Sequence, residues 1–243
     1  VAASVTRDGA RIISYGFDAD ADVRITAFTQ NANGSLITLS LRQQSLNYRL
    51  AVPGKGAALN SVASLIAADL LGVSLTEIVT SLEAWRSDGQ HMGITALPLP
   101  GGGAVTLIDD SYNAEYLSML NAFEVAAQRA QEGGGRVIAL LGRIINLGDR
   151  SAAIHRSLAQ PLLAAGCQQA FLHGDEMCAL HDALPEEVRS GHFSTAEALV
   201  EAAAPALRDG DIVLVKGSVR NSDFRRVVGL LKRRLTASPA LAK

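Results

Sequence analysis

The spacing of apolar residues changes twice along the chain. Up to about residue 50, apolar and β-branched residues alternate with polar ones, which predicts strands at 11–17, 23–29 and 35–41. From about residue 57 the apolar positions recur every three or four residues, which predicts helices over 57–71 and 75–85. The first part of the chain is therefore expected to be a β meander followed by helices.

The second part alternates strands with helices. Strands are predicted at 104–109, 136–141, 168–172 and 211–216, and helices at 114–131, 150–165, 195–207 and 219–234. Strands joined in sequence by helices are parallel, so this pattern predicts a doubly wound, Rossmann-like α/β domain. Turn-forming residues at 87–90 and 98–103 flank the change of pattern, and we place the domain boundary near residue 93, giving domains 1–93 and 94–243.

Composition excludes several classes of function. The chain has 243 residues, 48% hydrophobic and 19% charged, with a net charge of −2. No apolar run approaches the roughly 18 residues needed to cross a bilayer, and no basic surplus favours nucleic acid or an anionic membrane. Cys167 and Cys178 lack metal-ligand spacing, so no metal site is expected. In the absence of a signal-peptide pattern, we expect a soluble, cytoplasmic protein with small-molecule partners.

Polar residues follow the predicted strands at three places. Asp109, Asp110, Ser111 and Asn113 follow the first strand of the second domain. A glycine-bracketed loop, 142–148, follows the next strand, and Lys216-Gly217-Ser218 ends the last one, before a predicted helix. Loops after parallel strands meet at one sheet edge, where ligands bind, and helix N-termini favour anions. The pattern favours a carboxylate or phosphate ligand.

Each of these loops also has a purely structural interpretation. Ser111 and Ser218 are acceptable helix caps, the glycines permit tight turns, and Lys216 is acceptable as a solvated surface cation. His155, inside a predicted helix, is of a kind that more often packs or faces solvent than binds a ligand. Neither the full phosphate-loop pattern Gly-x-x-x-x-Gly-Lys-Ser/Thr nor Gly-x-Gly-x-x-Gly occurs, and a dehydrogenase is disfavoured on the latter ground.

The motifs, in their order and spacing, resemble the Mur ligases, and among them the branch that joins D-alanyl-D-alanine to UDP-MurNAc-tripeptide. The family pattern Asp-Asp-Thr/Ser-Tyr-Asn-Ala is matched by residues 109–114, and Met119 follows at the family spacing. Its Leu-Gly-Asp-Met-x-Glu-Leu-Gly with a later His resembles 141–148 with His155. Its Val-Lys-Gly-Ser-Arg resembles 215–220, and its Gly-x-His-Asn-x-x-Asn-Ala resembles 54–61. The resemblance covers the distal part of the central ATPase domain and the whole C-terminal domain.

The resemblance implies an ATP-dependent ligase that forms an amide through an acyl phosphate in peptidoglycan precursor synthesis, adding D-alanyl-D-alanine or another amino acid or peptide. It implies that Asp110 holds the ATP ribose, that Ser111 and Asn113 line the nucleotide pocket, and that Asn60 approaches the adenine. It implies that Lys216 and Ser218 anchor the carboxylate of the incoming amine. Arg143, Asn146 and His155 are further substrate-binding candidates by their motif, while no catalytic residue is assigned. ATP and Mg²⁺ are the implied cofactors, held mainly by an upstream part that carries the phosphate loop.

Several positions depart from the family pattern. Gly56 stands where the family has His, Gln90 where it has Arg, Arg143 where it has Asp, Asn146 where it has Glu, and Glu115 where it has Asn. These departures leave two hypotheses: a divergent ligase with its own amine substrate, or a catalytically silent module that binds a nucleotide or peptide or scaffolds a biosynthetic partner. The intact motifs at 110–113 and 216–218 favour the ligase.

Overall fold

The computed structural model describes residues 11–31, 33–87, 89 and 91–236. The chain divides into two compact units, Val1–Arg86 and Ser87–Lys243, which are described separately below.

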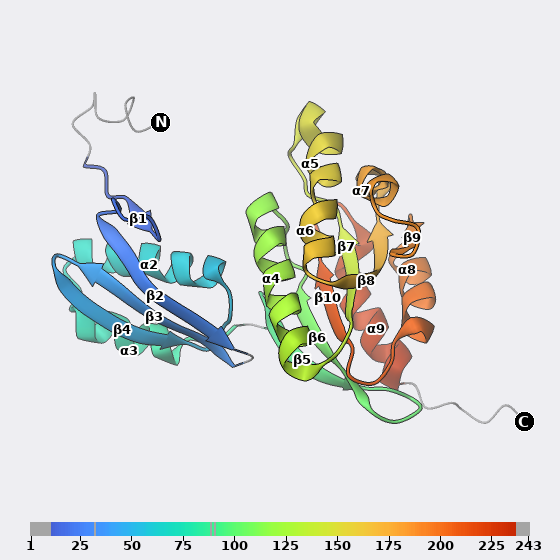
Figure 1. Cartoon of the computed structure of the whole chain (residues 1–243), viewed down its shortest axis with the longest axis horizontal. Coiled ribbons are helices and arrows are strands. Elements are labelled where there is room, and N and C mark those ends of the chain that lie inside the picture. The colour runs from blue at the N-terminus through green and yellow to red at the C-terminus, as the bar shows by residue number, and fades with distance from the viewer. Residues whose placement is uncertain (1–10, 32, 88, 90, 237–243) are drawn as a thin grey trace, which may run out of the picture. The chain divides into compact units, whose positions relative to one another are not determined.

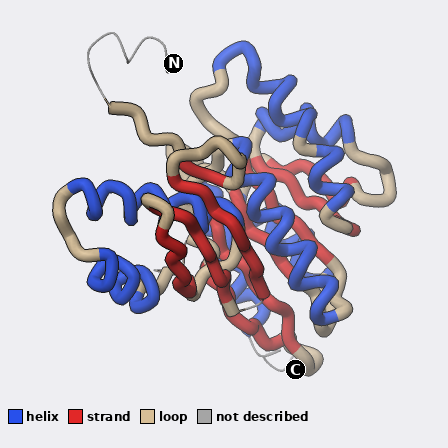
Figure 2. The backbone as a smooth tube through the Cα atoms, turned by 60° about the vertical axis from the view of Figure 1, so that its left-hand side comes forward, coloured by secondary structure: helices blue, strands red, loops and turns tan. Residues whose placement is uncertain are grey.

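The first unit is a small sheet with two helices on one side (Figures 1 and 2). Its strands lie in the order β1-β2-β3-β4, with β1 parallel to β2 and the other neighbours antiparallel. The strands are β1 (Tyr15–Gly16), β2 (Val23–Asn31), β3 (Gly34–Leu41) and β4 (Gln44–Leu50), and the helices are α2 (Lys55–Leu70) and α3 (Leu75–Ala84). Ile37, Leu39, Val62 and Leu65, fully buried, form the centre of the core between sheet and helices.

Strand β4 was not predicted, although its sequence carries a strand signal. Tyr48 and Leu50 are buried while Asn47 and Arg49, which precede each of them, are exposed, which is the alternation of a strand with one face in the core.

The second unit is a doubly wound α/β domain, which confirms the predicted fold class (Figure 1). The strand order is β5-β6-β10-β7-β8-β9, and all neighbours are parallel except β5, which is antiparallel to β6. The strands are β5 (Gly93–Pro98), β6 (Ala104–Asp110), β7 (Val137–Gly142), β8 (Cys167–His173), β9 (Arg189–Phe193) and β10 (Ile212–Lys216). Strand β10 lies inside the sheet and is buried along its whole length.

Helices cover both faces of this sheet (Figures 1 and 2). The helices are α4 (Tyr116–Gly133), α5 (Ser151–Ser157), α6 (Ala159–Ala164), α7 (Cys178–Ala183), α8 (Ala196–Ala203) and α9 (Val227–Thr236). Short 3₁₀ turns precede or follow some of them, at Gly148–Arg150, Asp175–Met177, Ala204–Ala206 and Asp223–Arg226. The core on the side of α8 and α9 includes Leu107, Val213, Leu199 and Leu231, all with no exposed surface.

The helix predicted over 219–234 begins later than expected, so the prediction that Ser218 lies at a helix N-terminus is wrong. Residues after β10 form a loop, and the first helical turn after it is Asp223–Arg226. Its cap is Ser222, whose Oγ accepts the Phe224 N–H at 3.1 Å. Ser222, close to the buried Phe224, therefore determines where the helical turn begins.

Three elements of the second unit were missed: β5, α7 and β9. Strand β9 has the sequence Arg-Ser-Gly-His-Phe, and none of its residues is fully buried, so neither alternation nor an apolar run marks it. The predicted helix 150–165 is divided into α5 and α6 at Leu158.

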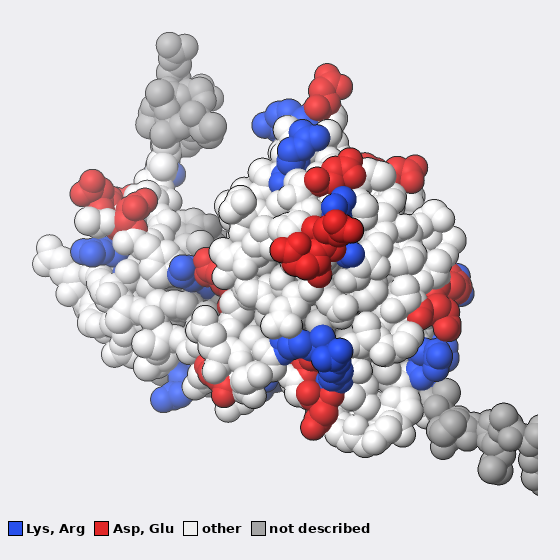
Figure 3. Space-filling view, turned by 45° about the vertical axis from the view of Figure 1, so that its right-hand side comes forward, with Lys and Arg blue, Asp and Glu red and all other residues white. Residues whose placement is uncertain are grey.

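Charged side chains of both signs are interspersed over the face shown in Figure 3, without a field of one sign. Among the helices within the described ranges, none combines the length and the apolar character required to cross a bilayer.

A largely buried ion pair lies at the N-terminal ends of the parallel strands β7 and β10. Arg136 donates from Nε to Asp211 Oδ1 at 2.9 Å and from Nη2 to Oδ2 at 2.7 Å. The Asp211 side chain is 1% exposed and also accepts the Arg208 N–H at 2.8 Å. This bidentate pair connects the segments that lead into β7 and β10.

We expect Asp211→Ala to lower the free energy of unfolding of the second unit by about 3 kcal/mol, because it leaves a largely buried guanidinium without its carboxylate. Glu201→Ala is the matched control, since its pair with Arg234 is exposed on both sides and should contribute less than about 0.5 kcal/mol. Urea denaturation of both variants measures the difference. Equal losses would contradict the assignment of Asp211 as a structural anchor.

Candidate ligand site at the strand ends

Three loops meet where β6, β10 and β7 end. The strands are neighbours in the sheet, and in register Lys216 lies beside both Asp110 and Leu141. The loops after them therefore start at one level, as expected for parallel strands. Gly217 permits a close approach, because a Cβ there would lie 2.5 Å from the Cα of Gly142. Glycine at 217 is required by packing between two loops.

A cavity of about 980 Å³ opens between these loops. Its apolar wall comes mainly from the loop after β7 and from α5, and includes Ile144, Ile145, Leu147 and Ile154. The remaining lining is aromatic, polar or charged: Tyr112, Asn113, Glu115, Tyr116, Asn146, Arg150, Ser157, Ser218 and Arg220. A smaller cavity of about 480 Å³ shares the loop Ile144–Leu147 and Arg220. The loop after β7 thus lines both cavities.

Asp110 and Lys216 form an ion pair at the edge of the sheet. Lys216 Nζ lies 2.5 Å from Asp110 Oδ2 and 3.2 Å from the carbonyl oxygen of Asn113. The other carboxylate oxygen, Oδ1, accepts the Met92 N–H at 3.1 Å. Lys216 is only 1% exposed, which excludes the interpretation of a solvated surface cation. In this structure its ammonium group is engaged by Asp110 and is not directed to a ligand.

Ser111 bonds back to Asp109 and does not cap α4. Its N–H and its hydroxyl donate to Asp109 Oδ1 at 3.2 and 2.6 Å, and α4 begins only at Tyr116. Burial raises the pKa of Asp109, partly offset by these two hydrogen bonds. Of the polar residues in this loop, Asn113 is exposed and lines the larger cavity, whereas Ser111 is buried.

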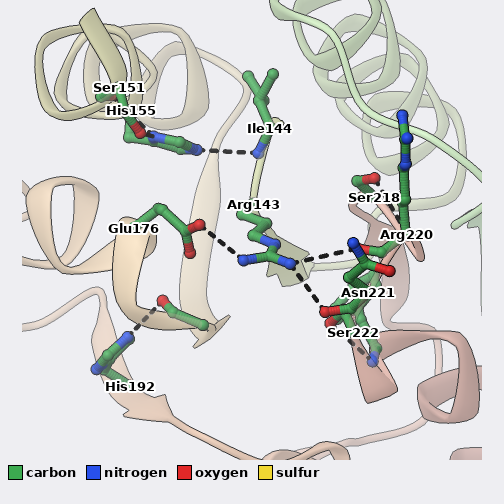
Figure 4. Close-up of polar contacts among 12 residues, drawn as sticks. Arg143, Ile144, Ser151, His155, Glu176, His192, Ser218, Arg220, Asn221 and Ser222 are labelled. Carbon is green, nitrogen blue, oxygen red and sulfur yellow. Dashed lines mark hydrogen bonds and ion pairs between the residues drawn. The ribbon is translucent and has the colours of Figure 1, made fainter. Parts of the chain in front are cut away.

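Arg143 connects the segments that follow β7, β8 and β10 (Figure 4). Its Nη1 lies 2.7 Å from Glu176 Oε1, and its Nη2 donates to the carbonyl oxygens of Asn221 at 2.9 Å and Arg220 at 3.3 Å. The loop after β7 is thereby tied to the loop after β10 and to the 3₁₀ turn after β8. The predicted direct binding of substrate by this side chain is not what the geometry favours, because its two terminal nitrogens are occupied by protein groups.

Glu176 was not among the residues predicted from the sequence, because its contact with Arg143 joins loops that meet only in three dimensions. Burial alone would raise the pKa of Glu176, but its own backbone N–H and the Arg143 guanidinium hold that pKa below its usual value. Glu176 is therefore an ionised partner for Arg143 at neutral pH.

His155 contacts the backbone of the loop after β7 and has no exposed surface. Its Nε2 accepts the Ile144 N–H at 3.0 Å, so the ring proton is on Nδ1, which lies 2.8 Å from the Ser151 carbonyl oxygen (Figure 4). Burial lowers its pKa, which keeps the ring neutral. His155, a substrate-binding candidate by its motif, is thus fully buried here and contacts the backbone of Ile144 in the apolar wall of the cavity.

Asn146 and Ser218 both line the larger cavity. Asn146 is exposed and has φ of 62°, a conformation that asparagine tolerates better than most residues. Ser218 is 1% exposed, its N–H donates to the Arg143 carbonyl oxygen at 3.0 Å, and its Oγ accepts the Arg220 N–H at 3.4 Å. Asn146 thus offers a side-chain amide to a ligand, whereas Ser218 mainly shapes the loop.

The remaining candidates are not among the residues that line this cavity. Asn60 is exposed on α2 of the first unit, and Gly56 is in the first turn of the same helix. Gln90 lies outside the described residues. Among the residues with described positions, no three His, Cys, Asp or Glu side chains come together to hold a metal ion.

Comparison with known proteins identifies the domain that carries the cavity. The family described as Mur ligase, glutamate ligase domain, matches residues 99–219, which contain the first two loops and the start of the third. The chain belongs to the Mur ligase family. The UDP-N-acetylmuramate–L-alanine ligase of Streptomyces avermitilis is 28% identical over 227 residues, covering 88% of this chain and 46% of that protein. The UDP-N-acetylmuramoyl-tripeptide–D-alanyl-D-alanine ligase of Escherichia coli is 27% identical over 219 residues, covering 88% and 45%.

The structure agrees with this family. The Mur ligase MurF of Thermotoga maritima, determined in complex with ADP, superimposes with a TM-score of 0.73 at 19% identity, covering 91% of this chain and 48% of that one. This likeness establishes a shared fold. The Mur ligase chain described here spans about half the length of the curated relatives it matches, 46% and 45% for the two named above.

The lowered pKa of His155 predicts a pH dependence of stability. Because the folded state binds this proton less readily than the unfolded state, the stability from the neutral ring is fully present above the unfolded-state pKa of about 6.5 and is lost as the pH falls through the folded-state pKa. Urea denaturation between about pH 8 and pH 5 should show this decline. His155→Gln should reduce the slope, whereas His181→Gln, at a more exposed histidine, should keep it. An unchanged slope in His155→Gln would contradict the burial argument.

Proposed function

We propose that the chain is part of an ATP-dependent ligase that joins a carboxylate to an amine through an acyl phosphate. The observation that carries the proposal is the convergence of three strand-end loops on one cavity inside the matched glutamate ligase domain. Such a ligase must hold the amine close to a reactive intermediate and exclude water from it. A half-apolar cavity with a few polar groups suits the amine side of this reaction.

In this proposal Asp110 and Asn113 bind the nucleotide. Asp110 would accept a ribose hydroxyl with the lone pairs left by Lys216 and Met92, and Asn113 lies exposed at the cavity beside it. Asn60 of the first unit would approach the adenine, and Ser111 would stabilise the loop through Asp109. The phosphate loop pattern does not occur in the 243 residues, so the proposal assigns the ATP phosphates and Mg²⁺ to another part of the complete protein.

The amine substrate is proposed to be a small amino acid or dipeptide. The relatives named above are named for L-alanine and D-alanyl-D-alanine, whose side chains are small and apolar. The cavity wall of Ile144, Leu147 and Ile154 would accept such side chains without a charged partner. The product would be a precursor of peptidoglycan, made in the cytoplasm where ATP is available.

A silent binding module is the second candidate. It is favoured by Arg143, which stands where the family has an acid and engages Glu176. The intact Asp110–Lys216 pair and the open cavity favour the ligase instead, because neither is needed for a scaffold.

The proposal is tested on the complete protein with ATP, Mg²⁺ and UDP-MurNAc-tripeptide or UDP-MurNAc, adding D-alanyl-D-alanine, L-alanine or other amines. We expect phosphate release that depends on both an acyl substrate and an amine. Binding of nucleotide without turnover on any of these combinations would favour the silent module.

Asp110→Asn should weaken ADP binding by about tenfold or more, because it removes a charged acceptor for the ribose and leaves the Lys216 ammonium without its anion. Calorimetric titration of ADP measures this loss. Asp209→Asn is a matched control, because the Asp209 carboxylate accepts the Ala104 N–H at 2.8 Å at the opposite end of β6. Equal ADP affinity in wild type and Asp110→Asn would refute the assignment of this loop to the nucleotide.

A further inference from the structure

Arg220 is the charged residue common to the lining of both cavities. Its backbone is held at two points: its N–H lies 3.4 Å from Ser218 Oγ, and its carbonyl oxygen accepts Arg143 Nη2 at 3.3 Å. Its side chain extends away from Arg143 (Figure 4). Within the part of the chain that the structure describes, no hydrogen bond or ion pair engages its guanidinium group. A fixed backbone thus presents an unengaged cation.

Arg150 is the other cation of the larger cavity, but it does not line the smaller one. Lys216 and Arg143 are not available in the same way as Arg220. Lys216 is buried and paired with Asp110, and Arg143 is engaged by Glu176 and two carbonyl oxygens. The charged residues of the larger cavity are Arg150, Arg220 and Glu115, so its lining has an excess of one positive charge. A ligand with a carboxylate matches that excess, and the flat guanidinium fork binds carboxylates with two hydrogen bonds.

We propose that Arg220 binds the carboxylate of the amine-bearing substrate, taking the role that the family resemblance implies for Lys216. The inference rests on the proposed function for the identity of that substrate. The site then selects amino acids or peptides with a free carboxylate and an apolar side chain, which lies against Ile144, Leu147 and Ile154. Glu176 and Arg143 are positioning residues, because they hold the Arg220 backbone without touching the ligand.

The test compares each amine with its C-terminal amide, which lacks the carboxylate charge. Binding of D-alanyl-D-alanine, L-alanine and the two amides to the complete protein with ADP is measured by calorimetry, and ligase turnover is measured in parallel. Wild type should bind at least one acid about tenfold or more tightly than its amide. Arg220→Met should lose that preference by weakening the acid about tenfold and the amide less than about twofold, with ADP affinity unchanged.

Control substitutions at other cations test whether the preference for the acid depends on Arg220 itself. Arg225→Met removes the same charge from an exposed position outside both cavities and should keep the preference for the acid. Lys216→Met should weaken ADP, through Asp110, and also keep the preference. Circular dichroism melting verifies that each variant is folded. Arg220→Lys should bind the acid more tightly than Arg220→Met does, because lysine keeps the positive charge.

The inference is overturned if Arg220→Met keeps the wild-type preference, if it weakens acid and amide equally, or if Lys216→Met or Arg150→Met abolishes the preference while Arg220→Met does not. It is also overturned if wild type binds no acid more tightly than its amide. Acid-selective binding without turnover would contradict the proposed ligase but support Arg220 as the carboxylate site, so the two failures are distinguishable.

Discussion

The Lys216 ammonium is buried at the end of a central strand, and a charge in that position is stable only if it is paired. The partner is supplied by register: β10 and β6 are parallel neighbours, and Asp110 lies beside Lys216. The carbonyl oxygen of Asn113 supplies a second acceptor, which draws the loop after β6 over the strand end. The pair is thus as much a constraint on the backbone as an electrostatic contact, and the cavity beside it depends on that constraint.

The loop after β7, which forms the apolar wall of the cavity, is held by one neutral and several charged contacts. His155 accepts a hydrogen bond from the Ile144 N–H, and Arg143 binds Glu176 and the carbonyl groups after β10. Arg143 stands at a position where the family motif has an acid, and in this chain it connects the loop to two neighbouring segments while the loop remains at the edge where the strands end. This accounts for a site that is recognisable and yet divergent.

The sequence was sufficient where a single segment determines the structure. Strands β6, β7 and β10 are apolar runs with polar residues at their ends, and the doubly wound arrangement follows from their alternation with helices. Strand β9 escaped prediction because its five residues, Arg-Ser-Gly-His-Phe, carry no apolar pattern. The helix after Ser218 was misplaced because Ser222 is an equally good cap and lies beside the buried Phe224.

For the site, the residue types were predicted more successfully than their roles. The three loops do converge, as parallel topology requires, but the pairing of Lys216 with Asp110 joins two residues that the motifs had assigned to different ligands. Glu176 was not predicted, because its role depends on a contact with Arg143, 33 residues away in the chain. Arg220 follows the third motif in the sequence, but only the structure shows that no group of the described residues engages its guanidinium.

The measurement that tests the account most directly is amide hydrogen exchange on the complete protein with ADP, with and without D-alanyl-D-alanine or L-alanine. If this cavity is the amine site, the amine should slow exchange in the segments 112–116, 144–147 and 218–220, which line the larger cavity. Protection by the amine that left these segments unchanged and appeared elsewhere would contradict the claim that this cavity is the amine site.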